Sequence, residues 1–308
     1  MRLSVILCTI RRPDLVAQCI RSLERQTYQD FEVLVVGGPR QTYCSEELSS
    51  TRAIRCLTAP KGLARARNVG LAEAHGDIIC FFDDDVVLSD DFLARTVAIF
   101  DDPGFADIVG LTGYDTHSYG MRIGWKWRLR RVLGVTRTLE AGASDHLGRN
   151  VPLNFAKPFD GYREVAWLPG FCQIFRAERI AGLLYDEESR AAEDRDFALA
   201  AGERGRMLMV GDLELAHHHD REARDSAASA VRRSSFALGR SFAKRRRSAV
   251  DWIAIGRNLF ADVLIDSVVA AAKPSRATWQ IVPNRVAGFV EGLQSLPPSV
   301  TRVNPASR

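Results

Sequence analysis

The first 113 residues alternate between short apolar runs and amphipathic segments of helical length. The run at 3–9 (LSVILCT) is continuously apolar and rich in β-branched residues, which is typical of a strand buried on both faces. Strands that alternate with helices at this spacing favour an α/β fold with a mostly parallel sheet and helices on both faces. The expected strands are 3–9, 31–36, 52–59, 77–82 and 106–113, and the expected helices between them are 12–26, 63–76 and 90–102.

The second half of the chain is less regular. Residues 114–165 mix aromatic and basic side chains, and the strand–helix pattern returns in 167–180, 191–205 and 207–220. From about residue 225 the composition changes to Ala-, Ser- and Arg-rich helix with no further clear strand. We therefore expect a catalytic domain at 1–222 and a basic, amphipathic helical extension at 223–308.

Composition narrows the class of protein. Hydrophobic residues make up 46% of the chain, enough to bury a core, and the net charge of +4 does not single out a nucleic-acid binder. The six cysteines are scattered without a CxxC pair, which favours a reduced, cytoplasmic protein. No window reaches the roughly 20 apolar residues of a membrane span, and we read the apolar N-terminal run as a strand rather than a signal peptide.

Three adjacent aspartates, Asp83, Asp84 and Asp85, directly follow the apolar run 77–82, and apolar residues resume after them. Neighbouring carboxylates repel one another, and an apolar flank makes their ionisation costlier. Ligands of open parallel sheets bind outside the carboxyl ends of the strands, and a divalent cation there would favour the ionised forms. Because successive strand side chains point to opposite faces, we expect Asp83 and Asp85 to converge and Asp84 to point elsewhere. The alternative is a polar cap where a strand leaves the core.

Three other polar clusters are candidates, and each has an ordinary structural alternative. Glu193 and Asp194 open a helix, as catalytic acids or as a helix cap. The histidines at 217–219 either join a metal or end a strand. The third cluster lies at the start of the helix at 63–76, where cations and backbone N–H groups suit a diphosphate or form a solvated face. It consists of Lys61, Arg65, Arg67 and Asn68.

The order and spacing of these stretches resemble the family-2 glycosyltransferases, although each stretch is weak alone. The resemblance covers roughly residues 2–222 and implies a GT-A-type mostly parallel sheet flanked by helices, with a C-terminal helical extension beyond it. The matching stretches are 3–36, 62–88 (GLARARNVGLAEAHGDIICFFDDDVVL), 167–180 (WLPGFCQIFRAERI), 192–197 (AEDRDF) and 213–219 (LELAHHH).

The resemblance also implies an activity and residue roles. It implies inverting, metal-dependent transfer of a sugar from a nucleotide-diphosphate sugar to a hydroxyl of a glycan or lipid-linked acceptor, in cell-surface polysaccharide or glycolipid synthesis. Asp194 would be the general base, and Asp85, Asp83 and His217 would hold Mn²⁺ or Mg²⁺. The expected donor-binding residues are Thr9, Arg11, Lys61, Arg67, Asn68, Asp83 and Asp84, and the expected sugar or acceptor pocket residues are Trp167, Pro169, Gly170 and Glu193.

One stretch departs from the family pattern. After the second strand the family usually has an acidic residue that reads the nucleotide base, whereas this chain has VVGGPR at 35–40. Either backbone groups of 37–40 read the base, or the donor nucleotide is not of the usual uridine type. The identity of the donor stays open.

Two other functions compete with sugar transfer. A nucleotidyltransferase that makes nucleotide sugars would need a glycine-rich phosphate loop after the first strand, but residues 8–14 (CTIRRPD) contain no glycine. A degenerate domain could instead bind nucleotide or membrane and act as a scaffold. The joint presence of Asp83, Asp85 and Asp194 argues against such decay.

Two segments, 119–134 and 231–265, combine aromatic, aliphatic and basic residues. Such a composition describes either a helix that lies in a membrane interface or a helix packed on the catalytic domain with its cations in solvent. We expect a cytoplasmic protein and leave open a peripheral contact with the inner face of the cell membrane. Nucleic acid is not an expected partner, because no stacking module or recognised nucleic-acid-binding fold is present.

Overall fold

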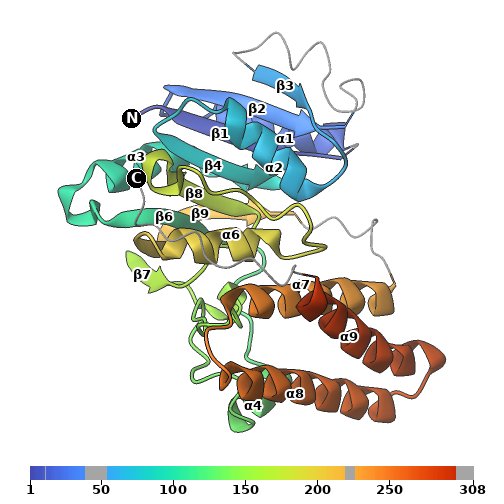
Figure 1. The fold of residues 1–308 in the computed structure, drawn as a ribbon. Coiled ribbons are helices and arrows are strands. Elements are labelled where there is room, and N and C mark those ends of the chain that lie inside the picture. Colours follow the sequence, from blue (N-terminus) through green and yellow to red (C-terminus); the bar gives the residue numbers. More distant parts are fainter. Residues whose placement is uncertain (11, 39–53, 219–225, 296–308) are drawn as a thin grey trace.

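The computed structural model describes residues 1–10, 12–38, 54–218 and 226–295. Within these residues nine strands form one sheet in the order β3-β2-β1-β4-β8-β6-β9-β5, with β7 paired to β9 (Figure 1). The strands are β1 (Leu3–Cys8), β2 (Phe31–Gly37), β3 (Ile54–Thr58), β4 (Ile78–Asp83), β5 (Val86–Leu88), β6 (Ile108–Asp115), β7 (Tyr162–Val165), β8 (Cys172–Arg176) and β9 (Arg206–His217).

The helices lie on both faces of this sheet and in a C-terminal layer (Figure 1). They are α1 (Pro13–Glu24), α2 (Leu63–Glu73), α3 (Phe92–Asp101), α4 (Trp125–Val132), α5 (Ala177–Ile180), α6 (Glu193–Gly202), α7 (Ala227–Arg245), α8 (Asp251–Ala272) and α9 (Arg276–Gln294), with short 3₁₀ turns η2 (Pro103–Phe105) and η3 (Leu153–Phe155). The predicted fold class, a mostly parallel sheet between helices, is confirmed.

The alternation of side chains along β1 explains why its sequence is apolar throughout. Leu3, Val5 and Leu7 pack into a core on one face of the sheet, which α1 and α3 cover. Ile6 and Cys8 pack into a second core on the other face, to which α2 and α6 contribute. All six β1 residues are buried because β1 also has parallel neighbours on both sides, β2 and β4.

One strand next to β4 runs in the opposite direction to its neighbours, and this arrangement positions the site. β8 pairs antiparallel with β4 and lies between β4 and β6, while β6 pairs parallel with β9. The short β5 then pairs antiparallel with the end of β9, with Val86 opposite His217. The carboxyl ends of β4, β6 and β9 therefore lie at the same edge of the sheet.

The three C-terminal helices pack on the sheet domain. Gly239 of α7 and Gly292 of α9 allow close approach, since a Cβ at either position would lie 2.2 and 2.1 Å from a carbonyl oxygen of the facing helix. α7 is tied to α6 by a hydrogen bond of 2.7 Å from Ser241 Oγ to Asp196 Oδ1. The predicted domain boundary at residue 222 lies outside the described residues and stays a prediction.

The cysteines differ in part from the expectation of reduced thiols. Cys8, Cys19, Cys80 and Cys172 are buried free thiols. Cys56 in β3, however, is disulfide-bonded. Scattered spacing in the sequence was therefore insufficient evidence that every cysteine is reduced.

A buried ion-pair network joins α8 to α4, to Arg149 in the segment after α4, and to α9. Asp262 of α8 is 3% exposed, and Arg149 donates to both of its carboxylate oxygens at 2.8 and 2.9 Å. Arg130 of α4 donates from Nε at 2.9 Å, and Arg285 of α9 lies 3.6 Å away. Burial alone would raise the pKa of Asp262, but the three guanidinium groups lower it well below its ordinary value.

Replacing Asp262 with asparagine should destabilise the protein by about 3 kcal/mol, because three largely buried guanidinium groups would lose their shared counter-charge. Urea unfolding measures the loss. Asp107→Asn is the matched control, since Asp107 forms a solvent-exposed pair with Arg206 and its loss should change little. Equal midpoints for the two variants would show that the network does not hold α8 in place.

Candidate active site

Two aspartates and a histidine meet at the carboxyl edge of the sheet. Asp83 is the last residue of β4, Asp85 follows in the turn, and His217 is the last residue of β9. One ligand atom from each side chain lies within 4.8 Å of the others. The pairing of β5 with β9 brings them together, and a backbone hydrogen bond of 2.9 Å from His218 N to Asp85 O closes the turn. Two carboxylates and an imidazole form a donor set that suits a divalent cation such as Mn²⁺.

Asp84 points away from this cluster, as the alternation of side chains predicts. Its side chain is fully buried, and Thr9 Oγ1 donates to Oδ2 at 2.5 Å. Arg12 Nη2 lies 2.6 Å from Oδ1 of the same carboxylate. Burial raises the pKa of Asp84 to about 6, although Thr9 and Arg12 both oppose the shift. Asp84 thus joins the β4 turn to the end of β1 and is not equivalent to its neighbours.

The three cluster side chains have different electrostatic environments. Burial acts to raise the pKa of Asp85, but a hydrogen bond from His217 and the charge of Arg12 lower it overall. The same contact, at 3.1 Å between Nε2 and Oδ1, raises the pKa of His217 despite its burial. Burial raises the pKa of Asp83, and the charge of Asp85 adds to this effect while Arg67 opposes it. The cluster therefore holds excess negative charge in partly dry surroundings, which a cation would offset.

Arg67 of α2 connects the two acidic elements of the site. It is 2% exposed, and its Nη1 donates to Glu193 Oε1 at 2.8 Å. Its Nη2 donates to the Gly170 carbonyl at 3.0 Å and lies 3.4 Å from Asp83 Oδ1. Its guanidinium also lies over the ring of Tyr185, 5.3 Å from the centroid. The buried guanidinium thus fixes the start of α6 relative to the end of β4.

Asp194 lies at the start of α6, close to this arginine. A Cβ at Gly170 would lie 2.6 Å from Asp194 Oδ2 and 3.1 Å from Arg67 Nη2, so glycine leaves the space that the carboxylate occupies. The residue before the helix, Ala192, has a φ of 54° and is the one non-glycine residue in the described ranges with a left-handed backbone. This conformation costs about 1 to 3 kcal/mol, and such strain often accompanies functional sites.

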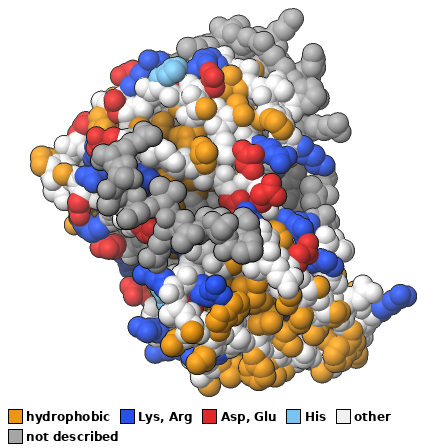
Figure 2. All heavy atoms as spheres, viewed as in Figure 1, with side chains coloured by type: hydrophobic (Ala, Val, Ile, Leu, Met, Phe, Trp, Pro, Cys, Tyr) orange, Lys and Arg blue, Asp and Glu red, His pale blue; other side chains and the backbone are white. Residues whose placement is uncertain are grey.

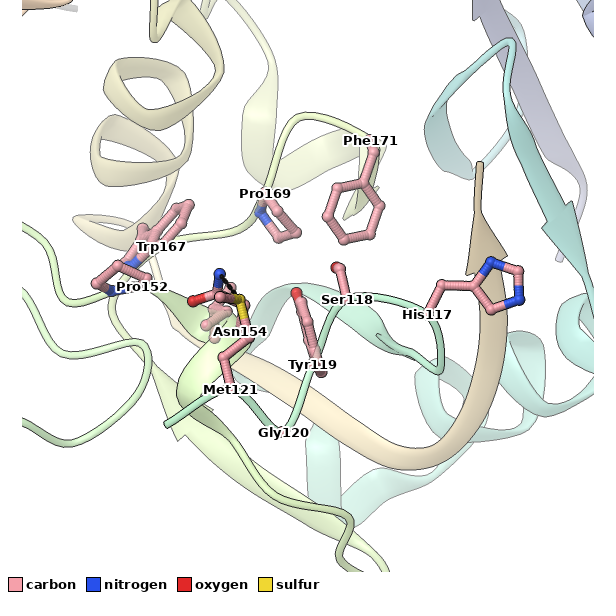
Figure 3. A pocket seen from close by; sticks show the side chains of 11 residues that line it. His117, Ser118, Tyr119, Gly120, Met121, Pro152, Asn154, Trp167, Pro169 and Phe171 are labelled. Carbon is pink, nitrogen blue, oxygen red and sulfur yellow. Dashed lines mark hydrogen bonds between the residues drawn. The ribbon is translucent and has the colours of Figure 1, made fainter. Parts of the chain in front are cut away.

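A pocket of about 620 Å³ lies next to the cluster, and Figure 3 shows the side chains that line this pocket. Trp167 and Pro169, predicted as sugar or acceptor pocket residues, line it together with 117–121, 152–154 and Phe171. Phe171 joins the pocket to the cluster, because its ring packs on His217 at 4.5 Å between centroids and its carbonyl accepts from Asp83 N at 3.2 Å. Gly170 and Glu193, predicted in the same group, do not line this pocket and contact Arg67 instead.

The remaining predicted residues have varied positions. Lys61 is exposed in the turn before α2. The side-chain amide of Asn68 makes two hydrogen bonds with the backbone of Tyr185. Its Oδ1 accepts from the Tyr185 backbone N–H at 2.8 Å, and its Nδ2 donates to the Tyr185 carbonyl oxygen at 3.0 Å. Asn68 therefore holds the 185–187 segment in place. Arg11, predicted to bind the donor, and His219 lie outside the described residues.

Two site residues were missed from the sequence. Arg12 reaches both Asp84 and Asp85, but from the sequence it was placed only in the helix expected at 12–26. Asp115 is fully buried at the end of β6 and accepts from His217 N at 3.1 Å, from His117 N at 3.0 Å and from Ser118 Oγ. An acid at the end of a parallel strand was the available signal for Asp115, because the rule that singled out Asp83 applies equally to β6.

Comparison with known proteins places this arrangement in a class. The mostly parallel sheet flanked by helices is similar to the fold of GT-A-type glycosyltransferases. Residues 4–178 match glycosyl transferase family 2, and the chain belongs to this family. The uncharacterized glycosyltransferase EpsJ of Bacillus subtilis is 32% identical over 210 residues, which cover 64% of this chain and 55% of EpsJ. The chain thus spans about half the length of that relative.

Two solved structures are similar in fold. The mannosyltransferase PcManGT from Pyrobaculum calidifontis, in complex with GDP-Man and Mn²⁺, aligns over 95% of this chain and 87% of its own, with a TM-score of 0.55 and 18% identity. TarS 1–349 from S. aureus, in complex with UDP-GlcNAc, aligns over 94% and 91%, with a TM-score of 0.53 and 15% identity. At these identities the likeness concerns the fold.

The raised pKa of Asp84 predicts a pH-dependent stability without metal. A carboxyl with a folded pKa of about 6 binds more protons in the folded than in the unfolded chain, where its pKa is about 3.9. Stability should therefore fall as pH rises from 4 through 6, by about 2 kcal/mol from this group. We expect Asp84→Asn to flatten this decline in urea unfolding with EDTA at pH 5, 6 and 7. Parallel declines in the two proteins would remove Asp84 as its source.

Proposed function

We propose that this protein transfers a sugar from a nucleotide-diphosphate sugar to an acceptor hydroxyl, with inversion at the anomeric carbon. The observation that carries the proposal is the convergence of Asp83, Asp85 and His217 beside a pocket. Asp194 lies beside Gly170 at the start of α6, which Arg67 contacts through Glu193. The family membership supports a glycosyltransferase activity. It also favours this activity over the nucleotidyltransferase alternative.

The residues divide into two groups by their chemistry. Asp85, Asp83 and His217 would hold a divalent cation, which would take up negative charge on the departing diphosphate. Asp194 is half-buried at the start of α6, and we assign it as the general base that accepts the proton of the acceptor hydroxyl. No protein nucleophile is required for a direct displacement.

Arg67 receives a different role from the one predicted for it. Its guanidinium is buried and already paired with Glu193, Asp83 and the Gly170 carbonyl, so we propose that it positions the acids rather than binds diphosphate. Burial and the adjacent Asp194 carboxylate raise the pKa of Glu193, and Arg67 counters this effect. Lys61, exposed before α2, remains our candidate for contact with the donor phosphates.

The substrates are proposed at the level of class. The complexes of two similar structures with GDP-Man and UDP-GlcNAc support a nucleotide-sugar donor, and the Mn²⁺ in one of them supports the cation. Trp167 and Pro169 line the pocket that we assign to the acceptor or the transferred sugar. We propose a glycan or lipid-linked acceptor in cell-surface polysaccharide or glycolipid synthesis, on the cytoplasmic side of the cell membrane.

The metal assignment is tested by thermal unfolding with Mn²⁺ and a panel of nucleoside diphosphates. Ligands that bind the folded state raise the melting temperature, so the effective nucleotide identifies the base. We expect Asp85→Asn to abolish the Mn²⁺-dependent shift, because the cluster loses one of its two carboxylates. Asp91→Asn, an exposed residue before α3, is the control and should keep it. An unchanged shift in Asp85→Asn would refute the metal role.

The base assignment is tested by turnover. Asp194→Asn should lower the transfer rate by about 10² to 10⁴-fold, because general-base catalysis typically contributes this factor. Donor and Mn²⁺ binding, measured by the same thermal shifts, should persist. Normal turnover in the variant would exclude Asp194 as the base. A wild-type protein that binds nucleotide and metal but transfers no sugar to any acceptor tested would favour the scaffold alternative.

A further inference from the structure

Helix α8 carries large apolar side chains on its exposed side as well as on its buried side. The residues that face the protein interior are the polar Asp251, Asn258 and Asp262 and the apolar Ile255, Ala261, Ile265 and Ala270. Its apolar residues Ile253, Phe260 and Val268 are 71%, 60% and 45% exposed. The two sets lie on opposite stripes of the helix, because residues three, four or seven positions apart share a face. Contact of the outer stripe of α8 with water is therefore energetically unfavourable.

The exposed apolar surface continues onto neighbouring helices. Trp125 and Val132 of α4, Trp252 of α8 and Trp279 of α9 are all at least 48% exposed. Figure 2 shows hydrophobic side chains gathered over α8 and α9 in the lower part of the molecule. We call the outer surface of α4 and α8 with the adjoining edge of α9 the α8 face. Exposed apolar surface of this extent on a folded protein marks a contact with another apolar phase.

The charges around the α8 face have one sign. Across the two segments that supply its helices α4 and α8 with their flanks, 122–132 and 246–280, no exposed residue is acidic, and the acids Asp251, Asp262 and Asp266 are buried or half-buried. Arg246 also lies over the ring of Trp252 at 4.5 Å, which joins cation and aromatic surface. The exposed cations of the two segments are Arg122, Lys126, Arg128, Arg131, Arg246, Arg247, Arg257, Lys273 and Arg276.

We propose that the α8 face docks the protein on the surface of a lipid bilayer that contains anionic lipids. Exposed Trp, Ile and Phe side chains would enter the boundary between headgroups and acyl chains, and the cations would meet lipid phosphates. No helix in the described ranges is both long and apolar enough to cross a membrane, so the contact is peripheral. The ion pairs of buried Asp262 with Arg130 and Arg149 fix the position of α8 on the protein. The apolar outer side of the helix is therefore presented by a rigid element.

The α8 face lies close to the pocket of the candidate active site. Trp127 of α4 packs edge-to-face on Phe155 of η3 at 6.0 Å between centroids, and the neighbouring Leu153 and Asn154 line the pocket. The pocket residue Met121 lies four positions before α4 and is 54% exposed. Docking would bring this pocket near the bilayer surface. A lipid-linked acceptor follows from this arrangement, and this consequence rests on the proposed sugar transfer.

Co-sedimentation of the full chain with vesicles tests the docking, without donor or acceptor. We expect strong partition to phosphatidylcholine vesicles that contain phosphatidylglycerol, weak partition to pure phosphatidylcholine, and loss of the difference at high salt. Arg128→Gln/Arg131→Gln should weaken partition about 30-fold, since each cation near an anionic surface contributes about fivefold. Ile253→Ser/Phe260→Ser should weaken it about tenfold or more, because both side chains would leave the interface.

Matched controls lie on other surfaces. Leu184→Ser removes an apolar side chain that is 69% exposed in the segment before α6, and Arg21→Gln/Arg25→Gln removes two cations at the end of α1. Both variants should bind vesicles like the wild type. Unchanged melting temperatures would confirm that all variants are folded.

Three results would overturn the proposal. The first is no partition to either vesicle, and the second is partition that Ile253→Ser/Phe260→Ser does not alter. The third is a dimer in sedimentation velocity that this variant abolishes and that excludes vesicles, which would assign the α8 face to a second copy of the chain. Because no sugar is transferred in the assay, failure here leaves the proposed activity untouched, and loss of the activity leaves vesicle binding measurable.

Discussion

The electrostatic cost of three adjacent carboxylates at the end of a buried strand is the constraint on which the site depends. The structure separates them at the end of β4 and in the turn that follows it. Asp84 contacts Thr9 and Arg12, and Asp85 contacts His217. Asp83 faces Arg67. Each carboxylate thus has a counter-charge or donor, with Arg12 shared between Asp84 and Asp85, and those contacts come from the segment after β1, from α2 and from β9. The turn after β4 is in this way the point where the outer elements of the fold are joined.

Arg67 extends this coupling to the second acidic element. A buried guanidinium without partners would be strongly destabilising, so its contacts with Asp83, Glu193 and the Gly170 carbonyl fix all three relative to one another. The start of α6 is held from the other side as well. Asp196 accepts from Ser241 of α7 and pairs with Lys244, so the C-terminal helices brace the helix that carries Asp194. The extension is therefore structurally continuous with the site.

The sequence predicted those parts of the molecule that follow from local periodicity. Continuous apolar runs predicted the parallel strands. The prediction that Asp83 and Asp85 converge without Asp84 agrees with the structure, although Asp84 and Asp85 lie in the turn after β4 and not in a strand. The direction of β8 could not be predicted, because a buried antiparallel strand between parallel neighbours has the same apolar composition. Arg67 was expected at a phosphate because a cation near a helix start looks the same whether it is solvated or buried. Its burial depends on Tyr185 and Glu193, more than 100 positions away in the chain.

In the C-terminal helices, too, the sequence alone did not predict which residues are buried and which are exposed. The sequence left open whether their basic and apolar residues face a membrane or the protein, and in the structure some of these residues are buried and others are exposed. Arg130, Arg149 and Arg285 are committed inward to Asp262, whereas the cations of the α8 face are exposed. A helical period reveals two faces but not which of them is inside. On α8 the inner face combines apolar residues with Asp262, whose charge is balanced by arginines from other segments, and the outer face is also apolar.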